Sequence, residues 1–156
     1  MPYLKRMCDG KLVATYFRKI APQSREPAWL FDWSLPVKSG ETILELMADG
    51  ISQGRIAFHA EADNLCYYVD ILETAKQNNT YIHGHKAYDG VGAHLFAEVA
   101  RRSFAAGFDG YVAFIAKTNI IGYYEHQLGA KRIGGQLMYI DTDAARRLVH
   151  RYYGGD

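Results

Sequence analysis

The sequence of 156 residues has little cysteine, almost no net charge and no long hydrophobic run, and each shortage excludes a class of protein. Its two cysteines, Cys8 and Cys66, lie far apart, which excludes the short spacings of zinc sites and redox motifs. A formal net charge of +1 provides no overall field for nucleic acid or an anionic membrane, so we expect neither as a partner. No window could span a bilayer, and the first residues lack the apolar core of a signal peptide. These absences predict a protein of the reducing cytoplasm.

What the sequence does contain is the composition of one globular domain. Its length is sufficient to bury a core, so residues 1–156 are predicted to form a single domain. Tyrosine is the unusual component, with 12 residues. Because tyrosine combines an apolar ring with a polar tip, it suits half-buried sheet faces and pocket walls, which hints at a lined cleft.

Two patterns occupy the first 40 residues. Apolar residues in 11–20 recur at helical spacing, and Asp9 is a plausible capping residue, so a helix is predicted there. Residues 29–35 alternate aromatic and apolar with polar side chains, which is the period of a strand. This aromatic stripe could line a ligand groove, although a buried sheet face is the favoured interpretation.

Three further strand patterns follow, over 42–48, 55–61 and 66–75. Short connections separate them, which suits an antiparallel meander. Residues 76–90 are polar and show no periodicity, so they are predicted to form a long loop. Long ordered loops are often functional.

The second half alternates helices and strands. Residues 93–106 have a continuous apolar face and are followed by Gly107, which predicts an amphipathic helix and its end. The apolar run 110–116 is typical of a central strand covered on both faces. A helix over 120–128, a strand over 136–140 and a final helix over 141–153 complete the order. The predicted fold class is α/β, with an antiparallel meander followed by a parallel strand–helix–strand unit and helices on both faces of a mixed sheet.

The stretch "KAYDGVGAHLF", residues 86–96, joins the meander to the long helix. Gly90 and Gly92 allow positive φ and leave no side chains in the way. The first N–H groups of the helix lack internal partners and lie at the positive end of its dipole, so the turn could hold a phosphate. A tight turn with no ligand is the alternative. The motif is neither a P-loop nor a dinucleotide fingerprint.

From Tyr67 to Ile140 the chain resembles the GNAT superfamily of acyl-CoA N-acyltransferases. The resemblance is carried by the strand "YYVDILETA", the turn "AYDGVGA", the helix "HLFAEVARRSFAAGF", the strand "GYVAFIA" and the helix "NIIGYYEHQLGA". It implies acetyl-CoA as co-substrate, with its pyrophosphate on the amides after Asp89. It also implies two splayed strands whose free backbone groups bind the pantetheine arm. The coenzyme-binding residues so implied are Leu72, Thr74, Gly90, Val91, Gly92, Ala93 and Asn119.

Two departures from the family pattern bear on this inference. Ala87 stands where the family has Gln or Arg, and the neighbouring Lys86 could supply the missing charge. The segment "YYEHQLG" has one more residue between Tyr124 and the glycine than the common family motif. Asn119 could cap the following helix instead of contacting the coenzyme.

Glu73 is the first candidate for the catalytic base. Strand alternation is expected to place it on one face with Tyr67, Val69 and Ile71, where desolvation would raise its pKa. A strand-end carboxylate in water is the alternative, and Asp70 is the second candidate for the base. Tyr124 occupies the family position of the tyrosine that protonates the thiolate. Its neighbour Tyr123 could replace it, and packing against the sheet is the bland alternative.

No metal is predicted, because His83 and His85 have no third ligand nearby and suit an exposed loop. The predicted function is transfer of an acetyl group from acetyl-CoA to a small-molecule or protein amine by direct attack. The alternative is a catalytically degenerate GNAT-fold module with a binding or regulatory role. The sequence leaves a homodimer open and does not identify the acceptor.

Overall fold

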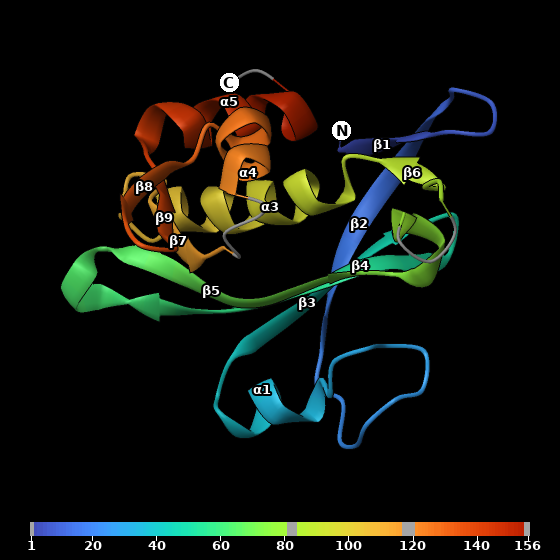
Figure 1. Cartoon of the computed structure of the whole chain (residues 1–156), viewed down its shortest axis with the longest axis horizontal. Coiled ribbons are helices and arrows are strands. Elements are labelled where there is room, and N and C mark those ends of the chain that lie inside the picture. The colour runs from blue at the N-terminus through green and yellow to red at the C-terminus, as the bar shows by residue number, and fades with distance from the viewer. Residues whose placement is uncertain (1, 81–83, 117–120, 155–156) are drawn as a thin grey trace.

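The computed structural model describes residues 2–80, 84–116 and 121–154, which build one mixed sheet with helices on both faces (Figure 1). The strands are β1 (Tyr3–Arg6), β2 (Leu12–Ile20), β3 (Thr42–Ala48), β4 (Ile51–Glu61), β5 (Cys66–Thr74), β6 (Tyr88–Asp89), β7 (Val112–Ile115), β8 (Lys131–Gly134) and β9 (Leu137–Ile140). The helices are α1 (Ser34–Lys38), α3 (Val91–Ala105), α4 (Ile121–Leu128) and α5 (Thr142–Tyr153). Short 3-10 turns cover Ala62–Asn64 and Lys76–Asn78.

The strand order across the described part of the sheet is β6-β1-β2-β3-β4-β5-β7-β9-β8. Strands β3, β4 and β5 pair antiparallel in sequence order, which confirms the predicted meander, and β2 pairs antiparallel with β3. Strand β7 then pairs parallel with β5 after the crossover through α3. The predicted helix–strand–helix–strand–helix order of the second half is confirmed as α3, β7, α4, β9 and α5.

The helix predicted over residues 11–20 is wrong, because this segment is strand β2. It pairs with β1 on one edge and with β3 on the other. Val13 and Phe17 pack against the core from one face, while Leu12 and Tyr16 are exposed on the other. Apolar residues on both faces of the strand therefore produced the helical spacing. Asp9 belongs to the β1–β2 turn, where its carboxylate accepts the Lys11 N–H at 3.1 Å.

The strand predicted over residues 29–35 is also wrong. The segment is an irregular loop that leads into the short helix α1. Trp29 and Trp33 pack edge to face, 6.4 Å apart, while Phe31 and Leu35 are exposed. The alternation therefore does not separate interior from solvent, since Ser34 is buried and two of the four alternating apolar residues are exposed.

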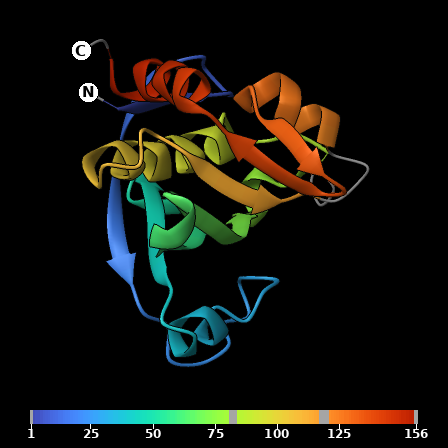
Figure 2. The same cartoon turned by 90° about the vertical axis from the view of Figure 1, so that its left-hand side faces the viewer.

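The two faces of the sheet are covered differently. We call the face under α3, α4 and α5 the upper face and the one that carries α1 the lower face (Figures 1 and 2). The upper face holds the large apolar core, which includes Leu46, Ile56, Leu95, Phe96, Val99, Phe114 and Met138. The lower face holds a small cluster of Trp29, Trp33, Ile43, Ala57 and Ala75. Within the described ranges, no helix is long and apolar enough to cross a membrane.

Candidate functional site

The central feature of the site is the point where β5 and β7 separate. Their parallel pairing is limited to three registers and ends at Val69 opposite Phe114. At the same point β5 carries a bulge, since Ala57 of β4 pairs with Ile71 and the next residue pairs with Val69. Asp70 is therefore the extra residue of β5. Beyond it, β5 is paired with β4 on one edge only.

The free edge of β5 presents the backbone of Leu72 and Thr74. Ala75 donates its N–H to the carbonyl oxygen of Gln53, toward β4, at 3.0 Å. Since successive residues of a strand direct their peptide groups to opposite edges, Leu72 and Thr74 direct theirs into the gap beside β7. These are the two strand residues that the family resemblance implies for the pantetheine arm.

Helix α3 begins beside this gap without a capping side chain. Gly90 has a left-handed φ of 82°, and no side chain among the described residues accepts a hydrogen bond from the first turn. The N–H of His94 donates to the Gly90 carbonyl at 2.9 Å. The N–H groups of Val91, Gly92 and Ala93 therefore lie at the positive end of the helix dipole, before the first intrahelical bond.

The two glycines of the turn have different surroundings. A Cβ on Gly90 would lie 2.5 Å from the Tyr152 hydroxyl, which donates to the Gly90 carbonyl at 3.2 Å. Gly90 is thus required for the contact between α3 and α5. A Cβ on Gly92 would meet nothing within 4 Å, so this position borders open space. An anion could therefore approach the amides at Gly92 without a steric barrier.

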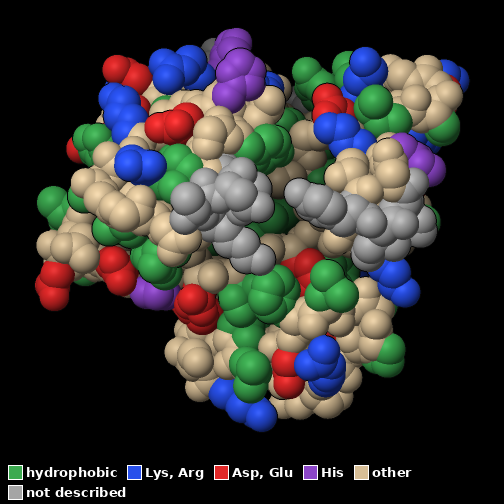
Figure 3. Space-filling view, in the orientation of Figure 1, with side chains coloured by type: hydrophobic (Ala, Val, Ile, Leu, Met, Phe, Trp, Pro, Cys, Tyr) green, Lys and Arg blue, Asp and Glu red, His purple; other side chains and the backbone are tan. Residues whose placement is uncertain are grey.

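A third glycine brings the helix end down onto the sheet. A Cβ on Gly54 of β4 would lie 3.0 Å from side-chain atoms of both Val91 and Leu95, and 3.1 Å from the Glu73 carbonyl oxygen. The first turn of α3 therefore lies directly over the β4–β5 pair where β5 has lost its second partner. Figure 3 shows the surface indented between the lobe of α4 and α5 and the lobe of β1 and β6.

A buried amide network, which sequence patterns did not reveal, positions the segment before α3. Asn78 donates to the Gln53 side-chain oxygen at 2.9 Å and accepts the Tyr88 N–H at 2.9 Å. The Gln77 side chain donates to the same Gln53 oxygen at 3.1 Å. The backbone carbonyl of Gln77 accepts the Ala87 N–H at 2.8 Å. Residues 84–90 are thereby tied to the start of β4, so their long-loop character does not make them loosely held.

Ala87 does not supply a ligand contact. Its side chain packs against the upper core. The adjacent Lys86 forms an exposed ion pair with Asp89, with 2.6 Å between Nζ and Oδ1. The positive charge at this end of α3 therefore comes from the helix amides and from Lys86 shared with Asp89.

Glu73 is buried, and its carboxylate binds the segment 30–33, which lies far away in the sequence. It accepts hydrogen bonds from the Leu30 N–H at 2.7 Å, the Phe31 N–H at 3.2 Å and the Trp33 indole N–H at 2.9 Å. The bulge at Asp70 reverses the side-chain alternation of β5, so Glu73 lies on the lower face. The expectation that it shares a face with Tyr67 and Val69 is wrong, because these two belong to the upper core. Ile71 does share the lower face with Glu73.

Tyr124 points inward, and Tyr123 points outward with 54% of its surface exposed. The Tyr124 ring packs edge to face on Phe114 of β7 at 5.0 Å and on Phe96 of α3 at 5.9 Å. Burial raises the pKa of the Tyr124 phenol, and its hydroxyl has no hydrogen-bond partner among the described residues. Asn119 and His83 lie outside the described residues. No group of three or more His, Cys, Asp or Glu side chains in the described part could hold a metal ion.

The lower face carries a second polar group at the bulge. His59 Nδ1 lies 2.7 Å from Glu41 Oε2, and His59 Nε2 lies 3.3 Å from Glu61 Oε2. Burial raises the pKa of Glu41, and the neighbouring Asp70 adds to the rise, although the hydrogen bond to His59 opposes it. Burial alone would lower the pKa of His59, but its hydrogen bond to Glu41 raises it overall. Proton-accepting groups are thus concentrated below the point of strand separation.

Comparison with known proteins supports the fold at the level of structure. No protein-family model matches the sequence, and no curated protein matches it. A GNAT-family protein from Desulfovibrio desulfuricans, assigned as an acetyltransferase, is 13% identical, with 81% of this chain and 96% of that chain covered and a TM-score of 0.55. A point mutant of the toxin AtaT, bound to the C-terminus of the antitoxin AtaR, is 13% identical, with 92% and 99% covered and a TM-score of 0.51. The chain has the GNAT fold.

Proposed function

We propose that the chain is an acyl-CoA-dependent N-acyltransferase that transfers acetyl from acetyl-CoA to an amine. The observation that carries this proposal is the free edge of β5 at Leu72 and Thr74, lying beneath the uncapped first turn of α3. Such an edge can pair with the amide groups of a pantetheine arm, as an added strand would. The amides of Gly90 to Ala93 can accept the pyrophosphate at the positive end of the helix dipole.

The donor set fits the coenzyme in charge and in shape. Gly92 leaves open space before the amides, so a phosphate oxygen can approach them closely. Because Ala87 contributes no charged side chain, the helix amides and Lys86, which pairs with Asp89, supply the positive charge. The D. desulfuricans protein, which is itself assigned as an acetyltransferase, supports the same class of activity for this fold.

In this reaction the amine nitrogen attacks the thioester carbonyl carbon, a C–N bond forms and the C–S bond breaks. A base must accept the proton of the amine, and an acid must donate a proton to the leaving thiolate. Tyr124 is proposed to protonate the sulfur, because it packs on Phe114, the β7 residue at which the strands separate, and a phenol is protonated at neutral pH. For the base, Glu73 remains the first candidate and Asp70 the second. The three hydrogen bonds to Glu73 use most of its acceptor capacity, whereas Asp70 is exposed at the bulge.

A second function is favoured by two observations. Ala87 in place of Gln or Arg, and the three hydrogen bonds that hold the carboxylate of Glu73, are features expected of a GNAT fold that binds a coenzyme without turning it over. Tight binding of acetyl-CoA with no acetyl transfer to a broad panel of amines would support this binding or regulatory module over the enzyme.

The test is calorimetric titration with acetyl-CoA of the wild type and of Gly92→Leu. We expect the leucine to weaken binding at least about tenfold, a loss of about 1.4 kcal/mol, because it fills the space before the amides. Ala105→Leu provides the matched control, since it adds a leucine at the exposed far end of the same helix. No binding to the wild type at high micromolar acetyl-CoA, or equal binding to Gly92→Leu, would reject the proposal.

A further inference from the structure

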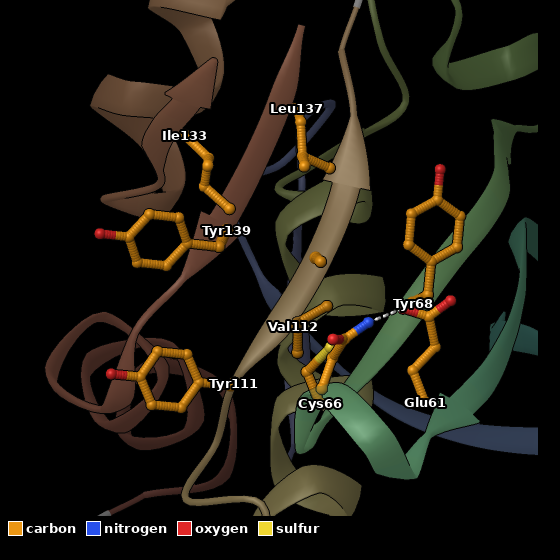
Figure 4. Close-up of a pocket in the computed structure, with 10 residues that line it drawn as sticks. Glu61, Cys66, Tyr68, Tyr111, Val112, Ile133, Leu137 and Tyr139 are labelled. Atoms are coloured by element: carbon orange, nitrogen blue, oxygen red, sulfur yellow. Dashed lines mark hydrogen bonds between the residues drawn. The ribbon is translucent and has the colours of Figure 1, made fainter.

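A cavity of about 620 Å³ lies on the lower face of the sheet, beneath β5, β7, β9 and β8 (Figure 4). Tyr68, Tyr111 and Tyr139 line it together with Ile133 and Leu137. These residues come from β5, β8, β9 and the residue just before β7, so the cavity exists only when β7 is inserted between β5 and β9. Its volume is in the range that holds a small organic molecule.

The aromatic rings of the cavity are arranged to receive a flat ligand. The rings of Tyr111 and Tyr139 are nearly parallel, with centroids 6.3 Å apart and planes at 21°. Tyr111 is 39% exposed and Ile133 is 62% exposed, so a large apolar surface lacks a partner within the described chain. An exposed apolar patch inside a concave site is typical of ligand binding.

The charge of the cavity is one-sided. Glu61 lines it, and no lysine or arginine is among the described residues that line it. Glu61 and Glu41 both contact the His59 imidazole, and Asp70 lies beside Glu41. Tyrosine faces and carboxylates both attract a cation. A ligand carboxylate would meet repulsion from Glu61.

The cavity ends where the coenzyme gap begins. Tyr68 of β5 and Ala113 of β7 both line it and are paired in register, one residue before the strands separate at Val69 and Phe114. A ligand in the cavity therefore reaches the gap from the face opposite α3. Asp70 and the Glu41–His59 pair lie at this same end.

We propose that this tyrosine pocket binds the acceptor, and that the acceptor is an arylalkylamine: a primary amine on a flat apolar body without a carboxylate. The inference rests on the proposed function for its link to acetyl transfer, but binding to the pocket stands separately. The ring lies between the tyrosines and the leucine and isoleucine side chains. The amine lies toward the carboxylates at the strand separation.

The experiment measures binding of 2-phenylethylamine, phenylalanine and 3-phenylpropionate to the whole chain, with and without coenzyme A. We expect 2-phenylethylamine to bind at least about tenfold more tightly than phenylalanine, which differs by one carboxylate, and 3-phenylpropionate to bind least. Equal affinity for the three, or no binding of 2-phenylethylamine at millimolar concentration, would overturn the proposal.

Two variants locate the binding. Tyr111→Ala should weaken binding of 2-phenylethylamine about tenfold, and Glu61→Gln should reduce the discrimination against phenylalanine. Tyr16→Ala is the matched control, because Tyr16 is 55% exposed on β2, away from the cavity. Unchanged binding to Tyr111→Ala in a folded protein would place the ligand elsewhere and reject the pocket.

The outcomes separate the two proposals. If acetyl-CoA binds and 2-phenylethylamine does not, the acceptor inference fails while the acyltransferase proposal stands. If 2-phenylethylamine binds through Tyr111 and acetyl-CoA does not bind, the acyltransferase proposal fails while the pocket assignment stands. Acetylation of 2-phenylethylamine that is lost in Tyr111→Ala supports both.

Discussion

The upper and lower faces of the sheet are stabilised by different kinds of contact. The upper face is buried under α3, α4 and α5 through a continuous apolar core. The lower face is covered only in part, by α1 and by the segment 26–33, which polar contacts hold in place. The upper face is therefore filled by packed apolar side chains, whereas the lower face leaves a cavity beneath β5, β7, β8 and β9.

The lower-face contacts centre on Arg55, which is 5% exposed. Its guanidinium pairs with Glu45 at 2.9 Å and with Glu26 at 2.7 Å. It also lies 4.2 Å from the centroid of a Trp29 ring. Because these interactions are directional, they fix the 26–33 segment without filling the whole face. Four predictions test this division between the faces.

The largest effect is expected from Phe96→Ala in the upper core. Phe96 is 2% exposed and packs against Phe114 with ring centroids 4.8 Å apart. The truncation should lower the free energy of unfolding by about 3–5 kcal/mol in denaturant titrations. Phe31→Ala makes the same change at a residue that is 49% exposed on the lower face, and should cost less than about 1 kcal/mol. Equal losses in the free energy of unfolding for the two variants would contradict the proposed difference between the faces.

The upper face should also show a specific sensitivity to acid at His94. Its Nε2 lies 2.8 Å from the Thr15 hydroxyl, and its ring stacks on Tyr152 at 4.6 Å. Burial lowers the pKa of His94 to about 4. The unfolded chain binds the proton below about pH 6.5 and the native protein does not until about pH 4, so stability falls as pH falls through this window.

The expected loss from this residue is about 3 kcal/mol between pH 7 and pH 4, measured by urea unfolding at each pH. In His94→Gln this part of the pH dependence should disappear. His150→Gln is the control, because His150 is exposed on α5 and the slope due to His94 should persist. An unchanged slope in His94→Gln would contradict the assignment.

Glu73→Gln should lower the free energy of unfolding by about 1–3 kcal/mol, because the new side-chain N–H would face one of the three N–H groups that donate to Glu73. The same variant tests whether Glu73 is a base or a positioning residue. Loss of kcat with a changed pH–rate profile indicates a base. A profile of unchanged shape with a raised KM for the amine indicates that Glu73 only positions the segment 30–33.

The smallest effect is expected from Arg18→Ala. Arg18 pairs with Glu45 at 2.6 Å, but its side chain is 56% exposed. In Arg18→Ala, Arg55 continues to pair with Glu45. The loss in the free energy of unfolding should therefore be less than about 1 kcal/mol and should be smaller still in high salt. Arg55→Ala should cost several times more, because it removes a buried guanidinium that pairs with both Glu45 and Glu26 and leaves the buried Glu45 with only the exposed Arg18. Similar losses for the two arginines would show that Arg55 does not organise the lower face.

The sequence predicted elements that have a local pattern, and it missed features that depend on contacts between strands. Helix α3 was predictable, because its apolar positions repeat every three or four residues and its terminal glycine is adjacent in sequence. Strand β8 was not, because all four of its residues are exposed and its partner β9 defines it. The face of Glu73 was not predictable either, since a single extra residue at Asp70 reverses the alternation of β5.

The sequence by itself determined the order of the second half and the glycine turn at Gly90 and Gly92, because helix periodicity and turn geometry are local properties. Only the tertiary structure decided the separation of β5 and β7, the binding of Glu73 by residues 30–33 and the tyrosine pocket. Each of these depends on the register between strands, or on contacts between segments far apart in the chain. Such contacts are selected by packing and leave no periodic signal in the sequence.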